Sequence, residues 1–231
     1  MAYLELADWR RRVAGLYAEV RALALTDPAQ ALTHWQRVRE HLYRTHPQSP
    51  LPISERAAFT AQHFPPDPAL RFEVPVVVDT PAQVGHAGQG QEEGRALARP
   101  APGAAADATP SAAIPTNTGG TMALRRIGWV DVPFPAGTRR LALFWMEGYA
   151  GGLYLPFRDA TNGVDTYGAG RYLLDGAKSA DLGGDPARDT LILDFNFAYH
   201  PSCAFDPRWA CPLTPPENHL DLPIRVGERL P

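Results

Sequence analysis

Residues 193–220 read LDFNFAYHPSCAFDPRWACPLTPPENHL, and the interpretation of the whole chain starts from this segment. It begins inside an apolar run, TLILDFNFAY (190–199), in which large apolar side chains alternate with Asp194 and Asn196. A period of two places these two polar side chains on one face of a strand. The five prolines that follow oppose both a helix and a central strand. We therefore expect a strand that presents Asp194 and Asn196, followed by a stiff cover across the end of a sheet.

Short apolar or alternating runs also fill the chain around this segment. Between residues 121 and 231 they are MALRRIGWVDVPF, RRLALFWMEG, GGLYLPFRD, GRYLLD and LDLPIRVG, separated by glycine and proline. Turn signals at this spacing are typical of an antiparallel sandwich or a partly closed barrel. Residues 61–79 and 121–231 are therefore predicted to form a β-rich domain, a mostly antiparallel β-sandwich or partly open β-barrel.

The first 60 residues carry a different pattern. Apolar residues recur at spacings of three and four over residues 6–25 and again over 27–43, which indicates two amphipathic helices. Asp27 followed by Pro28 is a helix start, with an N-cap and a proline at the first helical position. The fold class is thus α+β, with residues 1–60 predicted to be a helical appendage that packs on the sheet.

Residues 80–120 are rich in alanine, glycine and proline and have almost no large apolar side chains. Such a composition cannot offset the entropy lost on ordering. We expect a flexible insertion or linker there.

Charge and hydropathy narrow the range of partners. The chain has 22 Lys+Arg against 25 Asp+Glu, a net charge of −3, with no long run of either sign. Nucleic acid is therefore not an expected partner. No apolar run is long enough for a membrane span or a signal peptide. We expect a cytoplasmic protein with no membrane partner, while the oligomeric state is not indicated by the sequence.

Several polar side chains could meet over the sheet. The period of two directs Arg158 and Arg171 toward the faces that also carry Asp194 and Asn196, if the three strands are neighbours. Guanidinium groups bind carboxylates and phosphates through paired hydrogen bonds. The preferred hypothesis is a pocket for a small anionic metabolite. Its expected ligand-binding residues are Arg158, Tyr167, Arg171, Asp194, Asn196, Tyr199 and Asn218. The structural alternative is that these arginines and acids form ion pairs that fix the register of the strands.

Two other kinds of activity stay open. In a hydrolase, Asp194 or Glu217 could act as a general base while the arginines stabilise developing negative charge. In an interaction domain, the motif would be structural and the two helices would bind a partner. The chain has no G-x-S-x-G, H-E-x-x-H or phosphate-loop motif, and we expect no cofactor.

The two cysteines allow three states. They form the pattern H-x2-C-x7-C-x7-H with His200, Cys203, Cys211 and His219, whose ligand types suit zinc but whose spacing is unusual for a zinc site. A disulfide that closes the short loop is the second state. Two buried, reduced thiols are the third.

Three stretches resemble a known family. They are LPFRDATNGVDTYGAGRYLLD, DFNFAYHPSCAFDPRWACPLTPPENHLDLPIRVGE and SPLPISERAAF with HFPPDPALRF. Together they are similar to the uncharacterised prokaryotic family known as domain of unknown function sixteen-eighty-four. The resemblance implies a cytoplasmic, mostly β domain of about 200 residues with no established reaction. It also implies that the family has asparagine where His200 stands and arginine where His219 stands, which counts against a four-ligand zinc site.

Overall fold

The computed structural model describes residues 2–78, 111–148 and 151–231. Within them a sheet of eight strands has the order β7-β6-β5-β4-β2-β9-β8, with β3 paired to β4, and all neighbours run antiparallel. The strands are β2 (Arg71–Val78), β3 (Ala112–Pro115), β4 (Thr121–Phe134), β5 (Gly137–Met146), β6 (Gly152–Phe157), β7 (Arg171–Asp175), β8 (Gly184–Asp185) and β9 (Thr190–Asp194). A separate pair joins β1 (Gln62–His63) to β10 (Glu228–Arg229).

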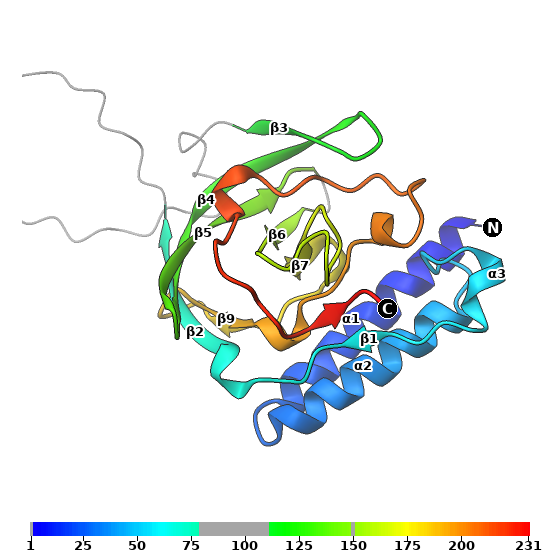
Figure 1. The fold of residues 1–231 in the computed structure, drawn as a ribbon, viewed down its shortest axis with the longest axis horizontal. Coiled ribbons are helices and arrows are strands. Elements are labelled where there is room, and N and C mark those ends of the chain that lie inside the picture. Colours follow the sequence, from blue (N-terminus) through cyan, green and yellow to red (C-terminus); the bar gives the residue numbers. More distant parts are fainter. Residues whose placement is uncertain (1, 79–110, 149–150) are drawn as a thin grey trace, which may run out of the picture.

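The sheet curls into a half-barrel around an apolar core (Figure 1). Tyr172 of β7, the strand at one edge of the sheet, also pairs with Tyr199, which follows β9 near the opposite edge. This pairing brings the two edges of the sheet toward each other. The inner core includes Leu143, Leu155 and Leu193, all almost fully buried. The predicted fold class, an α+β protein with two N-terminal helices and a mostly antiparallel, partly open barrel, is confirmed.

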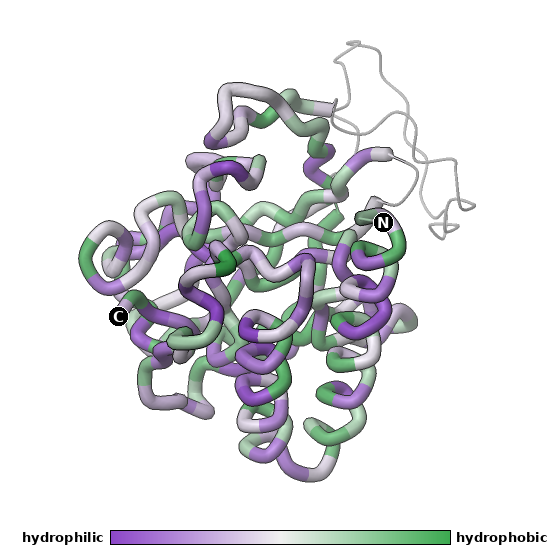
Figure 2. The backbone as a smooth tube through the Cα atoms, turned by 90° about the vertical axis from the view of Figure 1, so that its right-hand side faces the viewer, coloured by the Kyte–Doolittle hydropathy of each residue, from purple (hydrophilic) through white to green (hydrophobic). Residues whose placement is uncertain are grey.

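The helices α1 (Ala2–Leu23) and α2 (Pro28–Thr45) lie side by side along one side of the curl (Figure 1). Figure 2 shows hydrophobic and hydrophilic residues alternating along both, as amphipathic helices require. A second core forms where they meet the sheet, and it contains Val20, Trp35, Phe144 and Tyr154. The start of α2 is as predicted, since the Asp27 carboxylate accepts a hydrogen bond from the Gln30 N–H at 2.9 Å. No helix in the described part of the chain has both the length and the apolar character needed to cross a bilayer.

Short helical turns complete the fold. They are α3 (Ile53–Arg56), η1 (Pro68–Leu70), η2 (Gly176–Lys178), η3 (Phe195–Phe197), η4 (Ser202–Ala204) and η5 (Pro216–Asn218). The single strand expected over residues 190–199 is wrong, because β9 ends at Asp194 and η3 follows it. The physical reason is local capping: the Asp194 carboxylate accepts a hydrogen bond from the Asn196 N–H at 3.0 Å and turns the chain.

The insertion expected over residues 80–120 lies mostly outside the described residues. Its last part is described, and there β3 pairs with the first half of β4. The turn between them includes Gly119, whose φ of 81° suits a residue without a side chain. Strand pairing therefore reaches further back along the chain than the composition predicted.

Candidate functional site

Arg171 lies in the interior, where it holds the C-terminal segment. Its guanidinium donates to the Asp159 carboxylate at 2.7 Å and to the backbone oxygens of Ile224, Val226 and Glu228, and both side chains of the ion pair are fully buried. Burial lowers the pKa of Arg171, while the nearby Asp159 opposes that change. For Arg171 the geometry is therefore that of the structural alternative, a buried ion pair.

Asp194 and Asn196 lie together, but at a different place. The Asn196 amide donates to Asp194 Oδ1 at 2.7 Å, and it also binds both backbone groups of Asp67, at 2.8 and 2.9 Å. The second carboxylate oxygen, Oδ2, faces Arg71 Nε across 3.8 Å, which is too long for a hydrogen bond. The structure thus separates Asp194 and Asn196 from Arg171.

Asp194 lines a cavity of about 300 Å³, here called the Asp194 pocket. Its wall comes from the end of α1, the turn before α2, the start of β2 and the strands β8 and β9. The lining residues are Arg21, Ala22, Ala24, Leu25, Pro28, Arg71, Leu182, Gly183, Gly184, Ile192, Asp194 and Phe197. Two guanidinium groups and one carboxylate are therefore the charged groups of this wall.

The two arginines of the pocket were not predicted. Arg71 is the antiparallel partner of Asp194 across β2 and β9, and its side chain is about one third exposed. Arg21 reaches the pocket from the last turn of α1, donates to the Asp181 backbone oxygen at 2.9 Å and lies 3.6 Å from the Asp181 carboxylate. The sequence contained no local signal for either contact, because both join segments far apart along the chain.

Asn218 and Arg158 lie near β5 and β6. The Asn218 side chain is fully buried and binds the backbone of Ala142 and Pro156, which leaves no group for a ligand. Arg158 is half-buried, and its backbone pairs with Asn218 and Leu220. Among the described residues its buried Nε has no hydrogen-bond partner.

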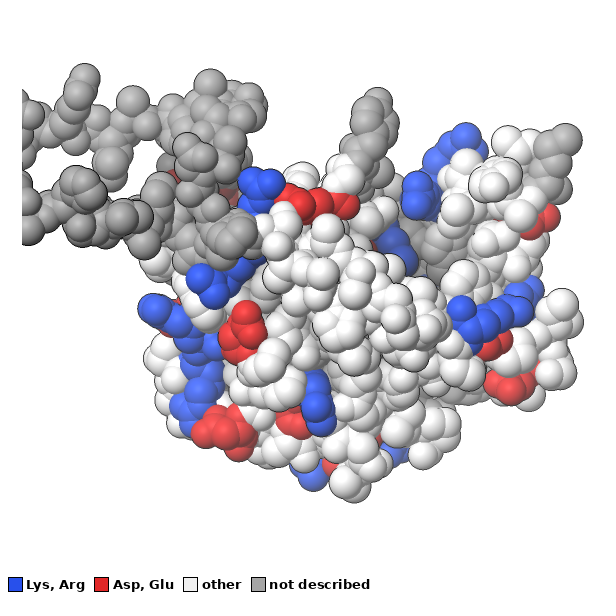
Figure 3. Space-filling model, turned by 90° about the horizontal axis from the view of Figure 1, so that it is seen from above, with Lys and Arg blue, Asp and Glu red and all other residues white. Residues whose placement is uncertain are grey.

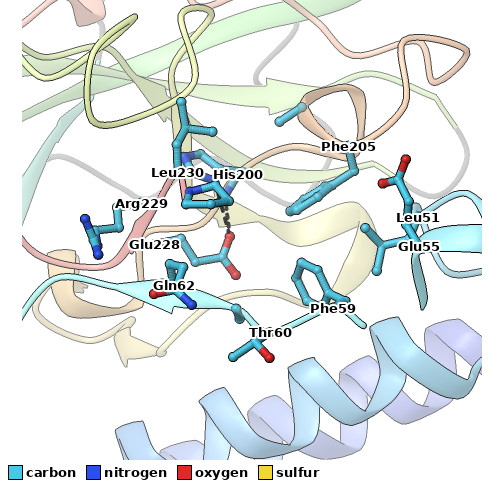
Figure 4. Close-up of a pocket in the computed structure, with 13 residues that line it drawn as sticks. Leu51, Glu55, Phe59, Thr60, Gln62, His200, Phe205, Glu228, Arg229 and Leu230 are labelled. Carbon is cyan, nitrogen blue, oxygen red and sulfur yellow. Dashed lines mark hydrogen bonds and ion pairs between the residues drawn. The ribbon is translucent and has the colours of Figure 1, made fainter. Parts of the chain in front are cut away.

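A second cavity, of about 220 Å³, lies over His200 and Glu228 (Figure 4). The Glu228 carboxylate binds the Arg39 guanidinium and accepts the His200 backbone N–H at 2.7 Å. The His200 ring nitrogen Nε2 accepts the Tyr167 backbone N–H at 3.2 Å. Burial lowers the pKa of His200 to about 4. Because Nε2 is already used as an acceptor, this histidine cannot take a proton from a substrate without breaking a backbone hydrogen bond.

Tyr167 and Tyr199 contact protein groups in the structure. Burial raises the pKa of Tyr167 to about 12. The Tyr199 hydroxyl donates to the Asp175 carboxylate at 3.4 Å, and the Arg39 guanidinium lies 4.5 Å from its ring centroid. Neither tyrosine lines the Asp194 pocket.

The four residues weighed as zinc ligands, although no metal was expected, have different contacts in the structure. His200 binds Tyr167 as described, whereas His219 is exposed and lies 3.3 Å from the Thr214 backbone oxygen. Cys203 and Cys211 are free and buried. Within the described ranges no group of three or more His, Cys, Asp or Glu residues could hold a metal ion. Glu217, the other expected base, is exposed on η5.

The face drawn in Figure 3 carries basic and acidic side chains interspersed. Several exposed charged side chains of the protein form ion pairs, including Arg140 with Asp131 at 2.7 Å. This face therefore offers no continuous surface of one sign.

The comparisons with known proteins agree with the fold. The family model described as "Protein of unknown function (DUF1684)" matches residues 100–229, which is more than half of the chain. The chain belongs to this family. The match includes β3 to β10, the buried Arg171 and both cysteines, so the part of the chain matched by the DUF1684 model contains the curled sheet except β2.

A solved structure is also similar. It is the solution NMR structure of an uncharacterised protein from gene locus rrnAC0354 of Haloarcula marismortui, 28% identical, with a TM-score of 0.55. The alignment covers 87% of this chain and 93% of that one, so it extends beyond the part matched by the DUF1684 model. No curated protein matches.

Proposed function

We propose that this DUF1684 protein binds a small metabolite in the Asp194 pocket. The ligand would carry a carboxylate or phosphate, which Arg71 binds, and a hydroxyl or amino group, which donates to Asp194. The proposal rests on the position of Arg71 and Asp194, whose side chains lie 3.8 Å apart, too far for a hydrogen bond, at the wall of a cavity of about 300 Å³. A cavity of this size with few convergent polar groups is typical of a small-molecule site.

The state of the two side chains supports this assignment. Arg71 has no hydrogen bond within the described residues and only the long contact to Asp194, so its five N–H donors are free for a ligand. The Asp194 carboxylate is held in place because both Asn196 bonds converge on Oδ1, which leaves Oδ2 toward the pocket. The site thus has one acceptor held in a fixed position, Asp194, and one cation without a fixed hydrogen-bond partner, Arg71.

The expected pocket of Arg158 and Arg171 is replaced in this proposal by one that uses Arg71 and Arg21. An arginine serves as an anion site only where its donors are unpaired or reachable. Arg171 is fully buried with four hydrogen bonds, whereas the Arg71 side chain is about one third exposed. The proposed ligand is still a small anionic metabolite, as expected from the sequence, but the pocket that would bind it lies elsewhere in the fold. A cytoplasmic location stays a prediction.

One observation favours a second candidate, a hydrolase that uses Asp194 as a general base. Burial raises the pKa of Asp194, with the Asn196 hydrogen bonds acting in the opposite direction. A carboxylate with a raised pKa at a cavity wall is a stronger base than an exposed one. This candidate requires that the protein converts a ligand bound in the pocket into a product. It is contradicted if the Asp194→Asn variant converts that ligand as fast as the original protein.

The proposal is tested with a thermal-shift screen of carboxylated and phosphorylated metabolites, followed by calorimetry of any that stabilise the protein. A ligand at about 100 times its Kd stabilises the fold by about 2.7 kcal/mol. We expect Arg71→Gln and Asp194→Asn each to weaken binding at least tenfold, about 1.4 kcal/mol. Asparagine keeps the oxygen that accepts the Asn196 bonds, so Asp194→Asn removes the charge and leaves the local turn intact.

Arg140→Gln is the matched control, because Arg140 forms an exposed ion pair with Asp131 on the β4–β5 hairpin, away from the pocket. Its affinity should equal that of the original protein. Binding that is equally strong in all three variants would place the ligand elsewhere and remove the proposal.

A further inference from the structure

Cys203 and Cys211 lie in direct contact although seven residues separate them in the chain. Cys203 is in η4, and Cys211 follows a loop that ends against the turn between β3 and β4. Asn117 in that turn accepts the Cys211 N–H at 2.7 Å and donates its own N–H to the Cys211 oxygen at 3.2 Å. The side chains of Cys203 and Cys211 lie close enough to interact with each other. The Cys211 end of the loop is held by the turn between β3 and β4.

The two cysteines differ in their relation to a nearby cavity. Cys211 lines a space of about 250 Å³, here called the Cys211 pocket, which is separate from the Asp194 pocket. Its wall includes Trp9 and Arg10 of α1, Lys178 of η2 and Trp209. Cys203 is not part of this wall, and both cysteines are buried. A small reagent that enters the pocket thus meets Cys211 first.

The surroundings also differ in charge. The donated hydrogen bonds from the Cys203 thiol and backbone, together with the ammonium of Lys178, lower the pKa of Cys211. The same contact between the thiols, together with burial, raises the pKa of Cys203. A thiolate is the reactive form of cysteine, and nearby cations stabilise it. Cys211 is therefore the cysteine that forms the attacking thiolate more readily, while Cys203 stays protonated.

We propose that Cys203 and Cys211 are a reversible thiol–disulfide pair, in which Cys211 reacts with a low-molecular-weight disulfide that enters the Cys211 pocket and Cys203 resolves the product. In the first step the Cys211 thiolate forms a bond to one sulfur of the reagent R–S–S–R and releases one thiolate, R–S⁻. In the second, Cys203 loses its proton, attacks the Cys211 sulfur and releases the other R–S⁻. The two cysteine thiols are oxidised to one disulfide, and the reagent is reduced to two thiols.

The positive wall of the pocket fits an anionic reagent. Arg10 and Lys178 contribute two cations against one carboxylate, that of Asp175, to which the Lys178 ammonium is paired. Oxidised glutathione carries several carboxylates and is the natural probe for such a surface. A metal-based role for the pair is not favoured, because within the described residues no third ligand joins the two thiols.

The test uses the full, reduced chain and oxidised glutathione under native conditions, with intact mass and peptide mapping as readouts. The original protein should lose two hydrogen masses and form the Cys203–Cys211 bond, reversibly with reduced glutathione. Cys203→Ser should accumulate a glutathione adduct on Cys211. Cys211→Ser should react at least about tenfold more slowly at Cys203, because Cys203 does not line the Cys211 pocket and burial still raises the pKa of its thiol. Circular dichroism checks that each variant is folded.

A second pair of variants tests the pocket without changing either sulfur. Lys178→Gln should slow the first step several-fold at neutral pH and shift its pH profile to higher pH, whereas Lys178→Arg should retain the rate and the profile of the original protein. Equal rates for Cys203→Ser and Cys211→Ser, reaction of both thiols only after denaturation, or stable adducts on the original protein with no intramolecular bond would each overturn the proposal.

Discussion

The Asn218 side chain substitutes for strand pairing that a proline prevents. The strands β5 and β6 pair between Phe144–Met146 and Gly152–Tyr154, and beyond this point β6 contains Pro156, which has no N–H. There Asn218 accepts the Ala142 N–H at 2.7 Å and donates to the oxygens of Ala142 and Pro156, at 3.0 and 2.7 Å. One buried amide thus satisfies three backbone groups that would otherwise be unpaired.

Replacing Asn218 with alanine is therefore expected to destabilise the protein strongly. Three buried backbone groups lose their partner, and at about 1 kcal/mol or more for each the free energy of unfolding should fall by about 3 kcal/mol. Urea unfolding followed by circular dichroism measures the change. Gln30→Ala is the control, since Gln30 is exposed, and it should shift stability by less than about 0.5 kcal/mol. A similar small shift for Asn218→Ala would show that water replaces the amide.

At the scale of single residues, the sequence pattern indicated which residues to consider together but not their contacts. The alternation around residue 194 brought Asp194 and Asn196 to attention, and the structure joins them at 2.7 Å. The partners of this pair, Asp67 and Arg71, come from a segment more than a hundred residues away, with a separation of 129 for Asp67 and Asn196. Only the pairing of β2 with β9 brings them together, and no local pattern specifies that pairing.

The elements of the fold were predictable where their periodicity is long. Both helices were expected within a few residues of their ends, because the apolar stripes of α1 and α2 extend over several turns. The turn η3 was not, since a run with alternating apolar residues also fits a strand. It forms because Asp194 caps it and because Asn196 binds Asp67, which is a tertiary contact. Short elements therefore depend on contacts that a local pattern does not contain.

A glycine at the start of β7 shows how closely elements approach. Gly170 has a φ of +103°, and a Cβ there would lie 2.5 Å from the Phe157 backbone oxygen of β6. Any side chain would separate the two strands next to the buried Arg171. The turn before β7 thus requires glycine for packing as well as for its backbone conformation.

The N-cap of α2 gives a prediction for a single element. Asp27 accepts the Gln30 N–H at 2.9 Å, and α2 supplies the fully buried Trp35 to the core between helices and sheet. Asp27→Ala should lower the free energy of unfolding by about 1 kcal/mol, because the first turn of the helix loses its cap. Asp27→Ser keeps a capping oxygen and should cost much less. The two variants are compared by chemical denaturation, and equal losses would mean that the cap contributes nothing.

The whole molecule is held together by its C-terminal segment. Ile224 and Val226 are buried in the inner core, and the carbonyl groups of residues 224, 226 and 228 bind Arg171. Glu228 then binds Arg39 of α2, while β10 pairs with β1. One short segment therefore connects the half-barrel to the helices. The sequence predicted only an apolar run of the β-rich domain over residues 220–227. Its links to Arg39 and Arg171 could not be derived, because each crosses from one part of the fold to another.

This connection makes the stability of the fold sensitive to acid. Burial lowers the pKa of His200 from 6.5 to about 4 in the folded protein. As pH falls from 6.5 to 4, the unfolded chain binds a proton that the folded protein excludes, so His200 removes about 3 kcal/mol of stability over this range. Glu228 acts in the same direction at lower pH: although burial alone would raise its pKa, Arg39 and the His200 N–H hold it below its usual value. Asp194 opposes them, since its raised pKa lets the folded protein bind a proton first.

We therefore expect the free energy of unfolding, measured by urea denaturation at a series of pH values, to decrease from neutral pH toward pH 4. His200→Gln should flatten this decrease, because glutamine does not titrate and its side-chain oxygen can still accept the Tyr167 N–H. His41→Gln is the matched control: His41 is exposed on α2, and its loss should leave the pH dependence unchanged. If His200→Gln and His41→Gln follow the same curve as the original protein, the buried histidine is not the group that links protonation to unfolding, and Glu228 with its arginine partner must account for the acid sensitivity alone.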